Sequence, residues 1–119
     1  MEKERVYISG AISGLPIEDY TKQFEEAEKD IAMWGLEAIN PVRVCGTLPK
    51  DTTWQEYMDV CMCLLKMCHK VYMLEGWEQS HGATIELRYA QRAGYDVIVK
   101  NGEVKDGYHQ LQYNNRKAD

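Results

Sequence analysis

Residues 71–99 read VYMLEGWEQSHGATIELRYAQRAGYDVIV. The stretch opens with the apolar run Val71–Leu74, continues with apolar residues at helical spacing, and closes with a second apolar run at Asp96–Val99. Ser80 is a typical N-cap residue and Gly94 a typical stop signal, so a helix is expected between them. A strand, a helix and a second strand in this order predict a βαβ unit with parallel strands.

Before this unit, a strand followed by a helix is predicted twice more. Val6–Ile8 is a short β-type run, and a helix is expected between Pro16 and Gly35. Leu36–Asn40 predicts a second strand, and Val42–Asp51, which contains a glycine and a proline, predicts a loop. The apolar residues of the first helix recur at helical spacing: Tyr20, Phe24, Ala27, Ile31 and Trp34.

The next helix is expected to begin near Thr52 or Thr53. Its apolar stripe consists of Trp54, Met58, Cys61, Leu65 and Cys68. Because further apolar residues widen this stripe, we expect the helix to be covered twice, by the sheet and by a neighbouring subunit.

Alternating strands and helices predict an α/β fold. We expect a single-domain, flavodoxin-like, doubly wound parallel sheet of four or five strands with helices on both faces. The 119 residues fit one domain, over 1–113, with a disordered tail at 114–119. Turn signals between 100 and 113 predict either a fifth strand or a segment that packs on a partner chain.

Composition limits the classes of partner. With 14 basic and 19 acidic residues and no basic cluster, the chain is not expected to bind polymeric nucleic acid. No apolar run reaches the length of a membrane span and the start lacks signal-peptide anatomy, so we expect a cytoplasmic protein without membrane contact. We interpret the four cysteines, Cys45, Cys61, Cys63 and Cys68, as reduced core residues, and expect neither a metal nor a cofactor.

In a doubly wound sheet, ligands bind beyond the carboxyl ends of the strands. The loops after the first three strands carry the candidate residues: Gly10, Ser13 and Gly14, then Asn40, Pro41 and Arg43, then Gly76, Trp77, Ser80 and Gly82. The third loop opens a helix, where free N–H groups favour an anion such as phosphate. Ser80 is expected both to cap this helix and to donate to a ligand.

Glu86 follows in the same helix, beside small apolar residues. A carboxylate on such a face needs partners or a pocket. Two interpretations stand side by side: a site carboxylate, or a scaffold acid that stabilises the helix dipole or pairs with Arg88 or Arg92. The glycines of the first loop also fit a simple tight turn, and Trp77 also fits a plain core residue.

These residues together resemble the nucleoside 2-deoxyribosyltransferase superfamily, most closely an uncharacterised bacterial and phage branch, over about residues 5–99. The resemblance rests on the following segments: Tyr7-Ile8-Ser9-Gly10 with Ser13-Gly14, Asn40-Pro41, Asp59, and Gly76-Trp77-Glu78-Gln79-Ser80-His81-Gly82-Ala83 running to Glu86. It implies that Glu86 is the nucleophile, Asp59 the proton donor near the nucleobase, and Tyr7 the residue that orients the glutamate. It further implies a substrate held by Ser9, Gly10, Ser13, Gly14, Asn40, Trp77, Ser80 and Gly82.

Three points depart from the pattern or stay open. Relatives that hydrolyse nucleoside monophosphates often have an arginine in the first loop, and this loop has none, so a phosphate partner must come from Arg43, Lys50, His81 or Arg88. Asp59 lies about 100° from the apolar stripe of its helix, so a solvated surface position is as open as a catalytic one. Glu86, near the positive end of its helix, is expected to stay ionised more easily than Asp59.

The resemblance implies cleavage or transfer of the N-glycosidic bond of a deoxynucleoside or its 5'-monophosphate, through a covalent glycosyl-enzyme. The alternative is a nucleotide-binding module with little or no catalysis, acting as a sensor or interaction domain. A third interpretation is a structural dimerisation domain. The expected partner is a small nucleoside or nucleotide. A homodimer or higher homo-oligomer is expected as well, because in relatives a neighbouring subunit completes the pocket.

Overall fold

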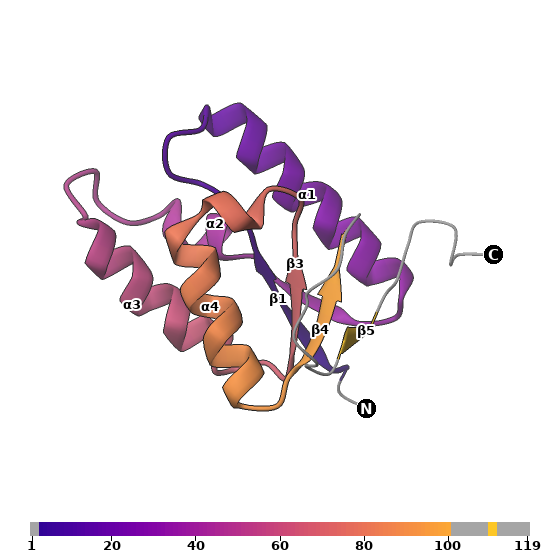
Figure 1. Ribbon diagram of the computed structural model, residues 1–119. Coiled ribbons are helices and arrows are strands. Elements are labelled where there is room, and N and C mark those ends of the chain that lie inside the picture. Colours follow the sequence, from indigo (N-terminus) through magenta and orange to yellow (C-terminus); the bar gives the residue numbers. More distant parts are fainter. Residues whose placement is uncertain (1–2, 101–109, 112–119) are drawn as a thin grey trace.

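The computed structural model describes residues 3–100 and 110–111, which form a parallel sheet with helices on both faces (Figure 1). The strands lie in the order β2-β1-β3-β4-β5. Their bounds are β1 (Arg5–Ser9), β2 (Glu37–Ile39), β3 (Lys70–Met73), β4 (Asp96–Val99) and β5 (Gln110–Leu111). This is the strand order of flavodoxin-like folds, so the predicted fold class is confirmed. The predicted option of a fifth strand is also confirmed, because β5 pairs in parallel with β4.

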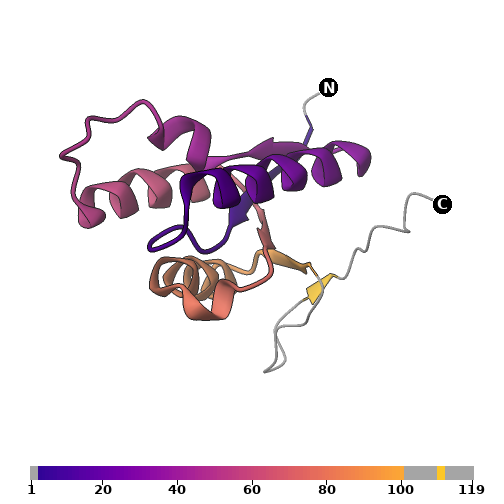
Figure 2. The ribbon, with the colours of Figure 1, turned by 90° about the horizontal axis from the view of Figure 1, so that it is seen from above.

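The helices form two layers, with α1 on one face of the sheet and α3 and α4 on the other (Figure 1). Their bounds are α1 (Ile17–Met33), α2 (Pro41–Cys45), α3 (Trp54–Leu65), η1, a 3-10 turn (Trp77–Gln79), and α4 (His81–Arg92). Seen from above, the loop between β1 and α1 lies beside η1 and the start of α4 (Figure 2). Both connections leave the carboxyl end of the sheet, where ligands bind in folds of this kind.

Alternation along β1 divides the core between the two layers. Val6 and Ile8 are buried against Phe24 and the other apolar residues of α1, whereas Tyr7 packs in the cluster formed with α3 and α4. Successive side chains of a strand point to opposite faces of the sheet, so Ser9 points to the same side as Tyr7. The strand thereby brings two hydroxyl groups beneath α4.

One segment predicted as loop is helical at its start. The prediction placed a loop over Val42–Asp51, but α2 covers Pro41–Cys45. Asn40 caps this helix by accepting a hydrogen bond of 2.9 Å from the N–H of Val42. Proline favours the first helical position and an Asn cap precedes it, so the start signal was present, but the helix is too short for a periodic apolar pattern.

The stripe predicted for α3 is wrong at both ends. The helix ends at Leu65, so Cys68 lies beyond it, although it is buried. At the other end Trp54 is 42% exposed and stacks on His81, with ring centroids 5.5 Å apart and planes inclined by 13°. The start near Thr53 is confirmed by a capping box in which Thr53 and Glu56 satisfy each other's N–H groups. Cover by a second subunit stays a prediction.

Within the described residues, no helix is long and apolar enough to cross a membrane. The predicted tail at 114–119 and the predicted domain boundary at 113 lie outside the described residues.

Phe24→Ala tests how far the α1 layer contributes to stability. Phe24 is fully buried against the sheet, so its truncation should lower the free energy of unfolding by about 3–5 kcal/mol. Met33→Ala on the same helix is the control, because Met33 is 62% exposed and its loss should change stability by less than about 0.5 kcal/mol. Urea denaturation of both variants measures the difference. Equal stabilities would contradict the assigned packing of α1.

Candidate active site

Three predicted site residues meet between β1 and α4. The Tyr7 hydroxyl donates a hydrogen bond of 2.6 Å to Glu86 Oε2, and the Ser9 hydroxyl donates one of 2.7 Å to Glu86 Oε1. All three residues are buried, and Glu86 is 5% exposed. Each carboxylate oxygen has its own hydroxyl donor, so the carboxylate is held in one orientation.

Glu86 takes neither scaffold role that the sequence suggested, a dipole-stabilising acid in the first turn or an ion-pair partner of Arg88 or Arg92. Glu86 lies in the second turn, and the first turn of α4 contains no acidic residue. The same helix face carries the buried residues Ala83 and Ala90, one turn away on either side. Among the described residues, no basic side chain forms an ion pair with Glu86. Its partners come from β1 instead.

Burial controls the charge of this carboxyl. Loss of hydration raises the pKa of Glu86 to about 7, and the hydrogen bonds from Ser9 and Tyr7 oppose this rise. The pKa of Tyr7 is also raised, first by burial and then by the nearby carboxylate. Desolvation therefore raises the pKa of Glu86 even though Glu86 lies near the positive end of α4, because the effect of the dipole fades beyond the first turn. The predicted comparison with Asp59 stays a prediction.

The arrangement leaves the carboxylate able to react. An ionised carboxylate has about four lone-pair positions, and the hydroxyls of Tyr7 and Ser9 use one on each oxygen of Glu86. Within residues 3–100, no other side chain donates a hydrogen bond to Glu86, so a lone-pair position on each oxygen is left unused. A buried, oriented carboxylate with unused lone pairs can act as a nucleophile or as a base near neutral pH.

The start of α4 agrees with part of the prediction for the third loop. Ser80 caps the helix, because its hydroxyl oxygen accepts a hydrogen bond of 3.1 Å from the N–H of Ala83. Donation from Ser80 to a ligand stays a prediction. Trp77 is half-buried and packs against the α3 and α4 cluster. A Cβ on Gly82 would lie 3.1 Å from Met58 Sδ, so the glycine allows α3 and α4 to approach closely.

The first loop has one packed glycine and an exposed tip. Gly10 is buried, and a Cβ there would lie 3.1 Å from Leu74 Cβ. Ser13 and Gly14 are exposed, and Gly14 has a φ of +82°, a conformation that glycine adopts without strain. The tight-turn interpretation therefore accounts for Gly14, and a contact of this loop with a substrate stays a prediction.

Two predicted site residues have other contacts in the structure. Asn40 is buried, and besides capping α2 its side chain donates a hydrogen bond of 2.9 Å to Glu28. Asp59 is exposed on α3 and accepts a hydrogen bond of 3.0 Å from Gln55. Neither residue joins the group around Glu86, and the roles proposed for them stay predictions.

Arg43, one of the possible phosphate partners, is committed to a carboxylate. Its Nε and NH2 groups donate hydrogen bonds of 2.6 Å and 2.8 Å to Glu28. Such a two-point contact is the strongest geometry available between arginine and a carboxylate. Of the other candidates, Lys50 and Arg88 are exposed, and His81 stacks on Trp54.

Sequence reasoning missed two neighbours of Glu86. Cys45 at the end of α2 and Cys61 in α3 lie with their sulfur atoms 4.0 Å apart, and the Glu86 carboxylate raises the pKa of both thiols, although less than burial does. The sequence indicated only that both residues belong to the core. The sequence placed Cys45 in the loop after the second strand, but no pattern indicated that its sulfur lies beside that of Cys61.

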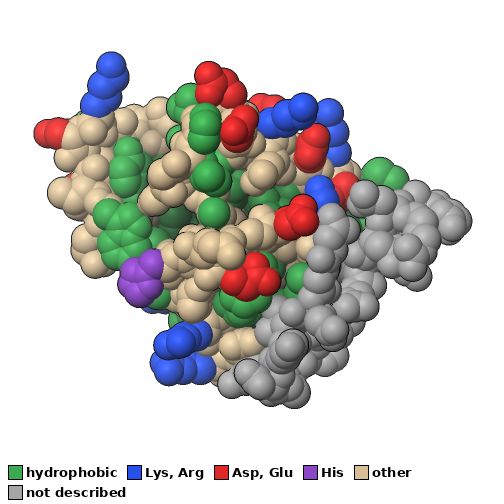
Figure 3. All heavy atoms as spheres, turned by 45° about the horizontal axis from the view of Figure 1, so that its top comes forward, with side chains coloured by type: hydrophobic (Ala, Val, Ile, Leu, Met, Phe, Trp, Pro, Cys, Tyr) green, Lys and Arg blue, Asp and Glu red, His purple; other side chains and the backbone are tan. Residues whose placement is uncertain are grey.

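Figure 3 shows the surface viewed from above and in front. Hydrophobic side chains are exposed across the middle of this face, with acidic side chains beside them, and Lys and Arg side chains lie mostly toward its rim. A continuous basic track, which polymeric nucleic acid requires, is not visible on this face.

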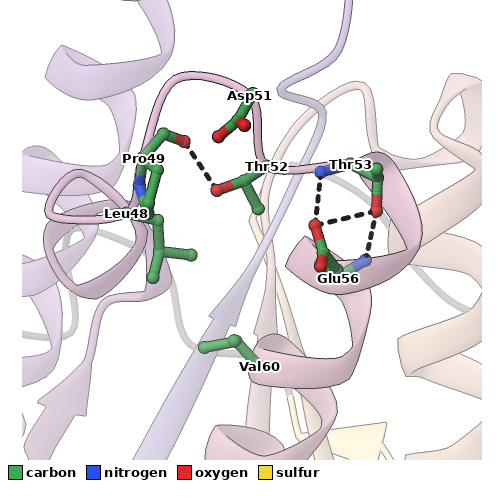
Figure 4. Close-up of a pocket in the computed structure, with 7 residues that line it drawn as sticks. All are labelled: Leu48, Pro49, Asp51, Thr52, Thr53, Glu56 and Val60. Carbon is green, nitrogen blue, oxygen red and sulfur yellow. Dashed lines mark hydrogen bonds between the residues drawn. The ribbon is translucent and has the colours of Figure 1, made fainter.

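A hollow of about 460 Å³ lies beside the start of α3 (Figure 4). Its lining residues are Leu48, Pro49, Asp51, Thr52, Thr53, Glu56 and Val60, and none of them is a predicted site residue. Several of its polar groups already satisfy one another, since Thr52 donates to the carbonyl of Pro49 and Thr53 and Glu56 form the capping box. Nothing in this hollow connects it with Glu86.

The family model of a domain of unknown function, DUF4406, matches residues 4–99. The chain belongs to the DUF4406 family. No curated protein matches it. The matched range contains β1, α4 and every residue of the group around Glu86, so the candidate site lies within the DUF4406 domain itself.

Two solved structures share the fold of this DUF4406 chain. A 2-deoxyribosyltransferase from the psychrotolerant bacterium Bacillus psychrosaccharolyticus superposes with a TM-score of 0.69 at 12% identity, over 92% of this chain and 85% of that one. The Clostridium botulinum CMP N-glycosidase BcmB gives a TM-score of 0.51 at 19% identity, over 97% and 93%. The resemblance to the nucleoside 2-deoxyribosyltransferase superfamily is thereby confirmed at the level of the fold.

Glu86→Gln should change how stability depends on pH. The folded chain holds the Glu86 proton with a pKa of about 7, above the ordinary value of 4.5, so ionisation of Glu86 disfavours the folded state. This penalty is absent below pH 4.5, grows between pH 4.5 and 7, and is complete above pH 7, where it reaches about 3 kcal/mol at most. Urea denaturation across this range should show wild type losing stability relative to Glu86→Gln. If the unfolding free energies of the two proteins changed equally with pH, the raised pKa of Glu86 would be contradicted.

Proposed function

We propose that this protein is an enzyme that cleaves or transfers the N-glycosidic bond of a deoxynucleoside or its 5'-monophosphate, with Glu86 as the nucleophile. The observation that carries the proposal is the buried Glu86 carboxylate, held by the hydroxyls of Tyr7 and Ser9 at the carboxyl end of β1. Two solved enzymes with the same fold, a 2-deoxyribosyltransferase and a CMP N-glycosidase, support N-glycosidic chemistry in general.

In the proposed reaction, a free lone pair of Glu86 attacks the anomeric carbon of the sugar as the carbon–nitrogen bond breaks. The departing base takes the bonding electrons and a proton, supplied by Asp59 or by solvent water, and the sugar stays bound to Glu86 as an ester. Water then releases the sugar, or a second base accepts it. Tyr7 and Ser9 hold the carboxylate in one orientation, which reduces the loss of freedom required to reach the transition state.

A small ligand suits the loops around this group. The loop between β1 and α1 lies beside η1 and the start of α4 (Figure 2), where N–H groups of the first turn favour an anion. The first loop contains no arginine and Arg43 is paired with Glu28, so we assign any 5'-phosphate to the backbone at the start of α4. We further propose that the enzyme acts as a homodimer, with the exposed Trp54 of α3 at or near the contact.

A nucleotide-binding module without turnover is the second candidate. The observation that favours it is the position of Asp59, the predicted proton donor, which is exposed and bonded to Gln55 rather than grouped with Glu86. A site with a nucleophile but no acid for the departing base would bind a nucleotide and release base slowly.

Release of free base from deoxynucleosides and their monophosphates, followed by chromatography, tests the first candidate. Glu86→Gln should lower release by about a thousandfold or more, and Tyr7→Phe by about a hundredfold, because each removes part of the oriented nucleophile. The rate should rise as pH increases through about 7, since Glu86 must lose its proton to attack.

Glu26→Gln is the matched control, because Glu26 is an exposed acid on α1, on the opposite face of the sheet from the Glu86 group, and it should keep full activity. Unchanged release by Glu86→Gln would refute the nucleophile. If nucleotides raise the melting temperature while no base appears from wild type, the binding module is the correct function.

Asp59→Asn separates an acid from a surface residue. If Asp59 protonates the departing base, the variant should cleave ordinary nucleosides about a hundredfold more slowly than wild type. Its rate should fall much less with a sugar substrate whose leaving group departs without a proton. The ratio of the two rates is the measurement. Equal losses with both substrates, or no loss with either, would remove Asp59 from the mechanism.

A further inference from the structure

Two thiols from different elements meet beside the candidate site. Cys45 ends the short helix α2, Cys61 lies in α3, and their sulfur atoms are 4.0 Å apart. Cys61 is buried, while Cys45 is half-buried and so open to small reagents. We propose that Cys45 and Cys61 form a reversible dithiol–disulfide pair whose oxidation lowers the activity of the Glu86 site.

Contacts connect this pair with the carboxylate. Cys61 interacts with the hydroxyl of Tyr7, and that hydroxyl donates to Glu86 Oε2 at 2.6 Å. The charge of Glu86 raises the pKa of both thiols. A change at the Cys61 sulfur therefore reaches the nucleophile through one side chain, and the effect on turnover rests on the function proposed above.

The geometry permits a disulfide after a limited movement. A disulfide requires a sulfur–sulfur distance of about 2.05 Å, so the two atoms must approach by about 2 Å. The movement can be taken up by α2, which has five residues and is followed by the irregular segment 46–53 before α3 begins. Because the new bond turns the Cys61 sulfur toward Cys45 and removes its proton, we expect its interaction with the tyrosine hydroxyl to be lost.

The oxidant in the proposed step is a low-molecular-weight disulfide, such as oxidised glutathione. The Cys45 thiolate attacks one sulfur of the reagent, forming a mixed disulfide and releasing one reagent thiol. Cys61 then loses its proton to solvent, and its sulfur attacks Cys45 Sγ, which releases the second reagent thiol. Two protein thiols are oxidised and one reagent disulfide is reduced to two thiols, so a reductant reverses the reaction.

The protonation of the pair limits the rate. Burial raises the pKa of Cys45, and raises that of Cys61 to about 12, so few thiolates exist at neutral pH. The titratable groups facing the pair are the Tyr7 hydroxyl from β1 and Glu86 from α4, and a charged Glu86 disfavours the thiolates further. Oxidation should therefore be about tenfold faster or more at about pH 9 than at about pH 7.

The bond itself is tested in the full-length Cys63→Ser variant, which removes the exposed third thiol. After oxidised glutathione the intact mass should fall by about 2 Da, the mass of two hydrogen atoms. Trypsin cleaves after Arg43, Lys50 and Lys66, so non-reducing peptide mapping should join 44–50 to 51–66. Adding Cys45→Ser should abolish the joined peptide, and a reductant should separate it. A joined peptide that never forms would overturn the proposal.

Base release by the oxidised and re-reduced protein tests the link to the site. Oxidation should lower release by roughly tenfold to a hundredfold, and reduction should restore it, because small displacements of a positioned nucleophile slow catalysis strongly. Equal rates in both forms would overturn the regulatory part. If the disulfide forms but neither form ever releases base, the proposed function fails. The redox switch is then tested by binding alone: the oxidised form must bind deoxynucleoside monophosphates more weakly than the reduced form, and equal binding would overturn the switch.

Discussion

The organisation of the candidate site depends on one constraint, which is that a carboxylate buried to 5% exposure needs donors that water no longer supplies. Glu86 obtains them from the hydroxyls of Tyr7 and Ser9, two residues apart on β1. Residues spaced by two share a face of a strand, so one strand supplies both donors. The same burial that requires these hydrogen bonds raises the pKa of Glu86 to about 7. The same packing therefore orients the Glu86 carboxylate and allows it to exchange a proton near neutral pH.

The fold provides this arrangement through its two layers. The α1 layer is anchored by large apolar side chains such as Phe24 and Ile31. The other layer combines core packing with reactive groups, because Tyr7 and Cys61 belong to the same buried cluster that holds α3 and α4 against the sheet. Cys45 joins this layer through α2. The proposed redox pair and the proposed nucleophile therefore share one set of packing contacts, and a movement in one is expected to affect the other.

Much of the architecture was predictable because local signals agreed with one another. Asn40, Thr53 and Ser80 occupy the cap positions of α2, α3 and α4. The predicted cap signals at Thr53 and Ser80 are confirmed, whereas Asn40 was interpreted as a substrate contact. Hydrophobic periodicity misplaced the ends of α3, since Cys68 continues the apolar spacing beyond the last helical residue. The helix α2 was not predicted, because five residues show no periodicity and only the start signals at Asn40 and Pro41 could have indicated it.

The sequence predicted the central carboxylate of the candidate site, but less of its surroundings. The sequence by itself determined the alternation of strands and helices, the hydroxyl-bearing end of β1 and the presence of a glutamate on the inward face of α4, because spacing along one element decides which face a residue occupies. Only the tertiary structure decided that Tyr7, Ser9 and Glu86 bond to one another, that Asp59 lies outside this group, and that Cys45 meets Cys61 beside it. Those contacts join residues from separate elements, and their distances depend on how closely helices and sheet pack in three dimensions.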